Sequence, residues 1–480
     1  MLKDDLTRAL ADIVGPEGVI DAPDELIVYE CDGLTLDKTA PHAVVFPTST
    51  EQVSAVVRLL HRDGIPFVAR GAGTGLSAGC LPLQGGVMIA LTKMNHILQI
   101  DLKNRRALVE AGVVNLWLTK AVSEKGYYYV PDPSSQQSCT IGGNIAENSG
   151  GPHTLKYGVT TNHTLGVEFV LPDGEVVWLG GQTDDATGYD LRGVVIGSEG
   201  TFGIVTRAWV RLCKLPQMYR TFLAVFETIQ DATNTVSGLI GRGVVPAALE
   251  MMDKVVVGAV EAAFHFGFPL DAGAVLIIEL DGLAAGMETL AQRVVEVCQE
   301  NRVREVRVAK DDTERTLLWT SRKRAFGALG RLSPSYYTQD GVVPRTKLPD
   351  IMRVIEAAGK KYRLLIGNVF HAGDGNIHPC IAFDERDPDQ TRRAVEASGD
   401  ILKACVEMGG SITGEHGIGY EKMNFMPLIF SDDDMTAMES LKAVFNPSNL
   451  CNPGKIFPTN RSCIGCGTLE LNRTNRMAAC

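Results

Sequence analysis

Two glycine-rich segments near the N-terminus constrain the fold of this chain most strongly. Residues 69–79 follow a strand-like run and hold four glycines, and residues 131–151 hold four more together with two asparagines. Glycine permits positive φ and leaves its backbone N–H unshielded, so successive N–H groups can form a concave anion site. Loops of this length are uncommon unless they are functional. The two segments together predict a binding site for a ligand of nucleotide size.

The spacing of these glycines differs from the common nucleotide-binding fingerprints. After Gly71 and Gly73, a dinucleotide turn needs a third glycine at position 76, where Leu76 stands, and the segment does not match a P-loop. A third, shorter segment of the same character spans residues 196–206. Two alternatives remain open at this point: a glycine loop without a ligand, and a nucleotide- or UDP-sugar-binding protein without redox activity.

Three of the nine histidines lie in two short pieces of the C-terminal third. His371 and His378 flank a Gly-Asp-Gly-Asn sequence, and Glu415 and His416 follow some 37 residues later. A hairpin-like reversal would bring both imidazoles to one point. Two imidazoles and a carboxylate are the minimal open site for Zn²⁺, Mn²⁺ or Fe²⁺. The alternative is that these histidines are satisfied by backbone groups in tight turns.

Hydrophobic periodicity predicts an α+β chain whose pattern changes at Lys214-Leu215-Pro216. Before this point we expect helices at 4–14 and 50–63 and strands at 43–46, 67–69, 87–90, 107–110, 166–171 and 176–179. After it we expect strands at 221–226, 275–280 and 303–308 and helices at 231–242, 285–300 and 313–328.

Composition excludes several classes of protein. The chain has 46 Lys and Arg against 57 Asp and Glu, a net charge of −11, which makes nucleic acid a poor partner. The sequence contains no run of about 18 apolar residues, so it predicts no transmembrane helix. The polar start argues against a secretory signal, and the eleven cysteines are then expected to be reduced thiols in the cytoplasm.

The three glycine-rich segments, in this order, resemble the FAD-binding domain of the vanillyl-alcohol oxidase/PCMH-type flavoenzymes. The resemblance implies that the first segment holds the FAD pyrophosphate, the second lies along the ribityl and isoalloxazine, and the third contacts the adenine end. Some members tether FAD through a histidine in the first segment, but Thr74 and no histidine stands there, so noncovalent FAD is expected. The implied FAD-binding residues are Arg70, Gly71, Ala72, Gly73, Thr74, Gly75, Ser77 and Gly79, then Pro131, Thr140, Gly142, Gly143, Asn144, Ala146, Asn148, Ser149, Gly150 and Gly151, and finally Glu199, Gly203 and Ile204.

The histidine motifs resemble the metal-dependent D-2-hydroxy-acid dehydrogenases of the same superfamily. This branch includes D-lactate and D-2-hydroxyglutarate dehydrogenases and the flavin subunit of bacterial glycolate oxidase, which the chain resembles most closely. By position, His371, His378 and Glu415 match the metal ligands and His416 matches the catalytic base. Residues 445–455 match the closing motif that returns to the flavin, and Asn452 is the residue expected nearest to it.

This chemistry explains why these residue types are needed. Oxidation of a 2-hydroxy acid removes a proton from oxygen and a hydride from C2. A metal acidifies the hydroxyl, and neutral imidazole suits His416 as the base near pH 7. The hydride goes to flavin N5. A guanidinium reads a carboxylate in bidentate fashion, and Arg322 matches the substrate arginine of the family; the alternative is a solvated helix face.

Two departures from the family pattern narrow the substrate. Members that act on 2-hydroxyglutarate carry a lysine where this chain has Thr338 and an asparagine where it has Cys380. Both losses remove groups suited to a distal carboxylate, so glycolate or D-lactate is the first expectation. D-2-hydroxyglutarate dehydrogenase and an alkyl-glycerone-phosphate-synthase-like transferase remain alternatives.

The resemblance also implies the domain organisation and the partners. We expect a PCMH-type FAD-binding domain of two α+β subdomains at 1–215 and an α+β substrate (cap) domain with an antiparallel sheet and the metal motif at 216–420. A segment returning to the flavin at 421–460 and a tail at 461–480 follow. The tail carries Cys463, Cys466 and Cys480, which do not match an iron–sulfur spacing. Electrons are then expected to leave to other glycolate oxidase subunits, including an iron–sulfur protein, in the cytoplasm or peripheral to the inner membrane.

Overall fold

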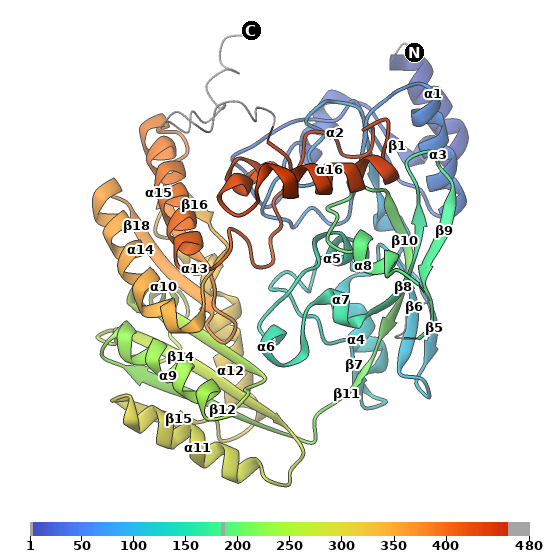
Figure 1. Ribbon diagram of the computed structural model, residues 1–480. Coiled ribbons are helices and arrows are strands. Elements are labelled where there is room, and N and C mark those ends of the chain that lie inside the picture. Colours follow the sequence, from blue (N-terminus) through green and yellow to red (C-terminus); the bar gives the residue numbers. More distant parts are fainter. Residues whose placement is uncertain (1–2, 184–187, 459–480) are drawn as a thin grey trace.

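The computed structural model describes residues 3–183 and 188–458 of the chain (Figure 1). The predicted tail with Cys463, Cys466 and Cys480 lies outside the described residues. Helices and mostly antiparallel sheets alternate along the chain, which confirms the predicted α+β class. The domain boundaries at 215, 420 and 460 stay predictions.

The first sheet is small and carries the first glycine-rich segment at the end of one strand. Its strand order is β1-β2-β4-β3, and β4 pairs in parallel with both β2 and β3. Ser49 caps the connecting helix α3 by accepting a hydrogen bond from the Gln52 N–H. The elements are α1 (Lys3–Val14), β1 (Val19–Ile20), β2 (Ala43–Val45), α3 (Thr50–Arg62), β3 (Phe67–Arg70) and β4 (Val87–Ala90).

A second sheet of five antiparallel strands follows, in the order β5-β6-β10-β8-β9. Its buried face shares one hydrophobic core with the first sheet. The strands are β5 (Ile97–Asp101), β6 (Arg106–Glu110), β8 (Thr164–Val170), β9 (Val176–Gly180) and β10 (Ile204–Arg211). The helices are α4 (Asn115–Ser123), α5 (Ile141–Glu147), α6 (Thr154–Tyr157), α7 (Thr160–His163) and α8 (Leu191–Val195), and β7 (Tyr127–Tyr128) pairs with β11 (Cys213–Lys214).

The third sheet is antiparallel and carries the histidine motif in its middle. Its order is β15-β12-β14-β13-β18-β19-β17, with β20 pairing β18 and β16 pairing β20. The strands are β12 (Met218–Phe226), β13 (Ala248–Asp253), β14 (Ala274–Gly282), β15 (Glu305–Val308), β16 (Ser335–Thr338), β17 (Gly341–Val342), β18 (Leu365–His371), β19 (Asn376–Ile377) and β20 (Pro379–Phe383). The helices are α9 (Ile229–Gly241), α10 (Lys254–Phe264), α11 (Met287–Glu300), α12 (Asp312–Lys323), α13 (Ala325–Leu329), α14 (Leu348–Tyr362) and α15 (Pro388–Glu407).

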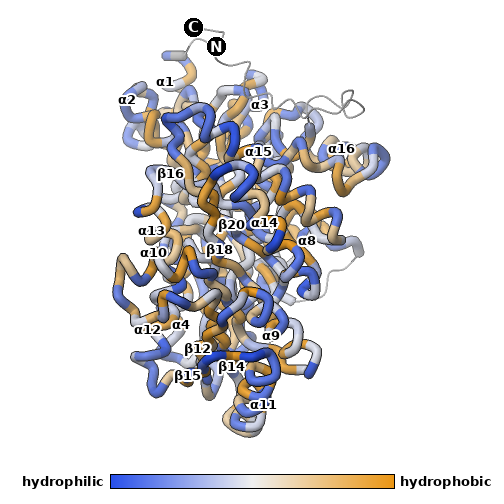
Figure 2. The backbone as a smooth tube through the Cα atoms, turned by 90° about the vertical axis from the view of Figure 1, so that its left-hand side faces the viewer, coloured by the Kyte–Doolittle hydropathy of each residue, from blue (hydrophilic) through white to orange (hydrophobic). Residues whose placement is uncertain are grey.

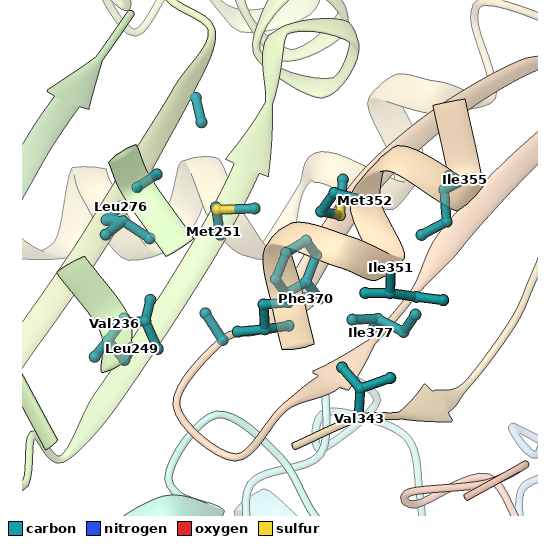
Figure 3. Packing of buried hydrophobic residues seen from close by; sticks show 14 of the residues in the cluster. Val236, Leu249, Met251, Leu276, Val343, Ile351, Met352, Ile355, Phe370 and Ile377 are labelled. Atoms are coloured by element: carbon teal, nitrogen blue, oxygen red, sulfur yellow. The ribbon is translucent and has the colours of Figure 1, made fainter. Parts of the chain in front are cut away.

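A large hydrophobic core supports this third sheet. Met251 on β13, Phe370 on β18 and Ile377 on β19 pack against Ile351 and Met352 of α14 (Figure 3). Hydrophobic residues predominate around the inner strands β18 and β20 (Figure 2), whereas the edge strand β15 has no fully buried residue. His371 therefore lies on a strand of a packed sheet rather than on a surface loop.

The C-terminal segment returns to the first sheet, and its expected approach to the flavin stays a prediction. Helix α16 (Asp432–Phe445) lies across the N-terminal part of the molecule (Figure 1), and Phe445 stacks on Phe202 with ring centroids 4.9 Å apart. The Phe67 N–H donates to the Leu450 carbonyl at 2.9 Å, and the Asn452 N–H donates to the Phe67 carbonyl at 2.7 Å. Residues 450–452 thus pair in parallel beside the strand that leads into the first glycine-rich segment.

Two predictions about secondary structure need correction. The single helix predicted at 313–328 is broken at Arg324, where α12 ends and α13 begins, because tertiary packing turns the chain so that Arg322 and Ala325 are both buried. Strand β13 was not predicted at all. Its buried pattern contains Glu250, a charged residue that interrupts the apolar run expected of a central strand.

Candidate functional site

The three glycine-rich segments meet around one cavity, together with the histidine motif. The walls come from β3 and its following loop, from α5, from the start of β10 and from the cap residues Phe326, Tyr336 and Thr338. The predicted FAD-binding residues that line it are Arg70, Gly71, Ala72, Gly73, Thr74, Gly75, Gly79, Thr140, Gly142, Gly143, Asn144, Ala146, Ser149, Glu199, Gly203 and Ile204. His378, Glu415 and His416 line the same cavity.

Glycine is required where the first two segments touch. A Cβ on Gly71 would lie 2.4 Å from Oγ1 of Thr140, which caps α5 by accepting from the Gly143 N–H. A Cβ on Gly73, whose φ is +68°, would collide with the guanidinium of Arg70. Close backbone approach of this kind leaves N–H groups facing the cavity, which fits a polar cofactor with a diphosphate.

The other predicted FAD-binding residues do not line the cavity. Asn452 lies behind the wall and donates from Nδ2 to the carbonyls of Gly79 and Glu199, at 2.9 and 2.8 Å. Asn148 adopts φ +53° and accepts from the Thr161 N–H at 2.9 Å. Ser77, Pro131, Gly150 and Gly151 are the remaining residues of this group. The side chains of Asn148 and Asn452 join separate segments of the chain to one another.

The hairpin of β18 and β19 brings the two predicted histidine ligands to one carboxylate. Nε2 of His371 lies 3.3 Å from Oε1 of Glu415, and Nε2 of His378 lies 3.2 Å from the same oxygen. The two rings are 5.2 Å apart and nearly perpendicular. The three candidate ligand atoms all lie within 4.8 Å of one another, so they can face one ion.

The outer nitrogens of both rings have partners that define the tautomer. Nδ1 of His378 lies 3.1 Å from the Gln339 carbonyl, which can only accept, so Nδ1 carries the proton. Nδ1 of His371 lies 2.8 Å from Oε1 of Glu250. In the neutral rings, both Nε2 lone pairs then face the Glu415 carboxylate, an arrangement that a cation between them stabilises. The donor set therefore fits a divalent metal.

The close approach of these charged groups shifts the pKa values of Glu415 and His371. Burial alone would raise the pKa of Glu415, but His371 and His378 outweigh it and hold the pKa far below its usual range. Burial would lower the pKa of His371, yet Glu250 and Glu415 raise it well above its ordinary value. Negative charge around the histidines thus favours a cation at this point.

Glu250 is a site residue that the sequence did not reveal. Its Oε1 faces His371, and its Oε2 accepts from Nε of Arg322 at 2.7 Å; all three side chains are buried. Nη2 of Arg322 is also buried and has no hydrogen-bond partner among the described residues. An orphaned guanidinium nitrogen in the interior is a ready donor to an anionic group. The only sequence signal for Glu250 was a charged residue in an otherwise apolar stretch, which was not predicted as a strand.

His416 stacks on the outer side of the metal-ligand candidates. Its ring is parallel to that of His378, with centroids 5.1 Å apart, and its Nδ1 has no partner among the described residues. Burial is the main cause that lowers the pKa of His416 to about 4, so its ring is neutral near pH 7. A neutral imidazole beside the cavity can accept a proton.

Among the described residues, the cap side of the cavity carries no lysine or arginine. Thr338 lines the wall, and its hydroxyl lies 3.5 Å from the buried thiol of Cys380. Among the described residues that line the cavity, Arg70 is the only lysine or arginine. The two positions that distinguish the 2-hydroxyglutarate members therefore lie together and carry no charge.

The chain matches known families over most of its length. Residues 41–180 match the model of an FAD binding domain, and residues 215–456 match the C-terminal domain of FAD linked oxidases. Glycolate oxidase subunit GlcD of Escherichia coli (strain K12) is 44% identical over 454 residues, covering 95% of this chain and 91% of the relative. D-lactate dehydrogenase of Anaerostipes hadrus is 33% identical, covering 90% of this chain and 91% of the relative.

Solved structures support the same architecture. p-Cresol methylhydroxylase superposes with a TM-score of 0.79 at 18% identity, covering 94% of this chain and 96% of the other, which speaks for the fold alone. Across the described residues, no helix is long and apolar enough to cross a membrane.

Proposed function

The chain belongs to the FAD-linked oxidases, and from this we propose that it oxidises a small 2-hydroxy acid, glycolate or D-lactate, to the 2-oxo acid. The observation that carries the proposal is that His371, His378 and Glu415 converge, and that His378 and Glu415 line the FAD cavity together with His416. The relatives named glycolate oxidase subunit and D-lactate dehydrogenase support the same substrate class.

FAD, held noncovalently by the glycine-rich segments, supplies the hydride acceptor for this reaction. His371, His378 and Glu415 would hold a single divalent ion, Zn²⁺, Mn²⁺ or Fe²⁺, which when bound would make the substrate hydroxyl more acidic. The remaining steps fall to side chains of the chain itself. His416 takes the hydroxyl proton on its neutral ring, and Arg322 binds the substrate carboxylate through the nitrogen that has no protein partner.

Glu250 fixes the position of the metal-ligand candidate His371 relative to that of the carboxylate-binding Arg322. One of its oxygens orients the His371 ring and the other orients the Arg322 guanidinium, so a single carboxylate relates the metal ligand to the anion-binding group. Pre-organisation of this kind holds C2 of the substrate in one place relative to the base and the flavin.

The described cap residues that line the cavity include no lysine or arginine, which supports a short substrate. Thr338 and Cys380 offer no cation to a second carboxylate, which argues against D-2-hydroxyglutarate as the preferred substrate. A phosphate-bearing substrate, as in an alkyl-glycerone-phosphate-synthase-like transferase, would also call for basic residues that the described lining lacks away from Arg70. We propose further that the chain acts in the cytoplasm, or at the inner membrane through its partners, as the flavin subunit of a complex with an iron–sulfur protein.

The experiment that tests this is anaerobic reduction of the bound flavin. Purified protein is mixed with glycolate, D-lactate, L-lactate or D-2-hydroxyglutarate, and the loss of flavin absorbance near 450 nm is followed. We expect glycolate or D-lactate to give the highest kcat/KM. A higher value for D-2-hydroxyglutarate, or no reduction by any of the four acids, would overturn the assignment.

A further inference from the structure

The loop that carries Glu415 and His416 has its backbone N–H groups bound by two carboxylates from distant parts of the chain. This loop, residues 413–419, is called the Glu415 loop below. It has no regular secondary structure, so its own hydrogen bonds cannot define where the two side chains point. The partners of its N–H groups decide this instead.

Asp340, between β16 and β17, holds the first half of the Glu415 loop. Its Oδ2 accepts from the N–H groups of Gly414, Glu415 and His416, at 2.9, 3.1 and 2.8 Å. The Thr413 hydroxyl donates to the same oxygen at 2.6 Å. Asp340 is buried and belongs to the third sheet, so this half of the loop is fixed to the cap side.

Glu199, from the third glycine-rich segment, holds the second half. Its Oε1 accepts from the Ile418 N–H at 2.7 Å, and its Oε2 accepts from the Gly419 N–H at 2.6 Å. Glu199 is buried and adopts φ +53°, a conformation that side-chain residues rarely take unless the surroundings demand it. The FAD-binding part of the molecule thus binds the loop through hydrogen bonds to both oxygens of one carboxylate.

The Glu415 loop leaves no room between itself and this carboxylate. Gly417 has φ +83°, and a Cβ there would lie 2.9 Å from Oε1 of Glu199 and 2.5 Å from Oε2 of Glu147. Gly419 has φ +52°, and a Cβ there would lie 2.1 Å from the Ser77 carbonyl. The loop is therefore built to lie against Glu199 and the first glycine-rich segment.

We propose that Glu199 is a positioning residue, which acts through the Glu415 loop to set Glu415 and His416 relative to the FAD-binding segments. The sequence resemblance implied an FAD-contacting role for Glu199. Both side-chain oxygens are instead engaged by the loop, so its contribution to the cavity comes from its place in the wall. This proposal rests on the proposed function, because it takes Glu415 as a metal ligand and His416 as the base.

The test compares Glu199→Gln with the matched control Glu168→Gln. Glu168 is also a buried carboxylate of the FAD-binding part, where it accepts from Thr50 and Thr206 and does not contact the Glu415 loop. A glutamine at 199 offers one acceptor oxygen and places an NH₂ group against a backbone N–H, so one of the two hydrogen bonds is lost.

The first readout is amide hydrogen exchange in the peptide covering residues 411–424, measured on the FAD-loaded protein. Loss of a charge-assisted bond is expected to speed exchange at positions 418 and 419 at least about tenfold in Glu199→Gln and to leave it unchanged in Glu168→Gln. The second readout is kinetic: kcat falls with little change in KM, because Arg322 is not on the loop. Flavin content stays at the wild-type value.

The outcomes separate this proposal from the proposed function. Unchanged exchange in Glu199→Gln would overturn the positioning role. Loss of FAD with unchanged exchange in the loop would also overturn it, and would support the FAD-contacting role that the sequence resemblance implied. Failure of the wild-type protein to oxidise any 2-hydroxy acid would refute the proposed function and leave the exchange result standing. If Glu199→Gln does not fold, Glu199→Asp keeps the charge and retracts it by one methylene, and the same faster exchange is expected.

Discussion

Nδ1 of His371 lies 2.8 Å from Oε1 of Glu250, across the antiparallel pair of strands β18 and β13. The two residues are direct partners in the register of that pair, so sheet geometry holds the carboxylate against the imidazole. The same carboxylate binds Arg322 on α12. A metal-ligand candidate and an anion-binding group are therefore joined through one buried residue.

This relationship predicts that Glu250→Gln weakens metal binding without removing flavin. The amide keeps the volume of the carboxylate but loses its charge and one acceptor. Changes to the outer partner of a ligand histidine lower metal affinity about 10- to 100-fold. Metal titration of the metal-free protein, with flavin content from absorbance, measures both quantities. Equal metal affinity in Glu250→Gln and wild type would contradict the prediction, and Glu168→Gln serves as the control.

Replacing His378 with alanine should remove bound metal and turnover together. The imidazole supplies one of three donor atoms that converge on one point, and the two that remain leave too few ligands for a stable site. FAD is expected to stay, since the glycine-rich segments are unchanged. Elemental analysis of the purified variant and steady-state turnover check this. Retention of metal at the wild-type ratio would take His378 out of the site.

His416→Ala should separate chemistry from binding. Flavin and metal are expected to remain at wild-type content, because the proposed metal ligands are His371, His378 and Glu415, while turnover falls at least about 100-fold. Single-turnover flavin reduction under anaerobic conditions measures the loss directly. Near-normal rates of reduction would show that another group accepts the proton.

Stability should decrease with rising pH through the titration of His153. This ring lies 2.8 Å from Asp132 and 3.7 Å from Glu279, where the FAD-binding part meets the third sheet. Burial would lower the pKa of His153, but the two carboxylates raise it to about 10, against an ordinary value of 6.5. The folded state therefore binds this proton more tightly than the unfolded state, and the stabilisation is complete below pH 6.5 and lost as pH rises towards 10.

The free energy of unfolding should fall between these pH values by at most roughly 1.4 kcal/mol per pH unit from this group. Denaturant unfolding of wild type and His153→Gln at pH 6.5, 8 and 9.5 measures the difference. The variant should be less stable at pH 6.5 and approach the wild type at pH 9.5. A stability gap that does not narrow with pH would refute the assignment.

Gly71→Ala should reduce FAD occupancy. The added methyl group would lie 2.4 Å from Oγ1 of Thr140, so the first two glycine-rich segments must separate or Thr140 must release the start of α5. The ratio of FAD to protein after purification measures the effect. Gly241→Ala is the matched control, because a Cβ at the end of α9 meets only open space. Full occupancy in Gly71→Ala would show that this close approach is dispensable.

Much of the site was predictable because its signals are local. A few neighbouring positions are enough to recognise the glycines at 71 and 73, which allow close backbone approach. The same holds for the two histidines on either side of a four-residue turn. The α+β class followed from periodicity for the same reason. The break at Arg324 was not predictable, since the helical pattern of the sequence continues through it and the burial of Arg322 and Ala325 is a matter of tertiary packing.

The sequence by itself determined which groups are available: three histidines, a carboxylate, an arginine and N–H groups exposed by glycine. Only the tertiary structure decided which carboxylates act on them. Glu250 reaches His371 across 121 positions, and Glu199 reaches Gly419 across 220. Such pairs are set by strand register and by the packing of distant segments around one cavity, and the spacing of residues along the chain carries no record of either.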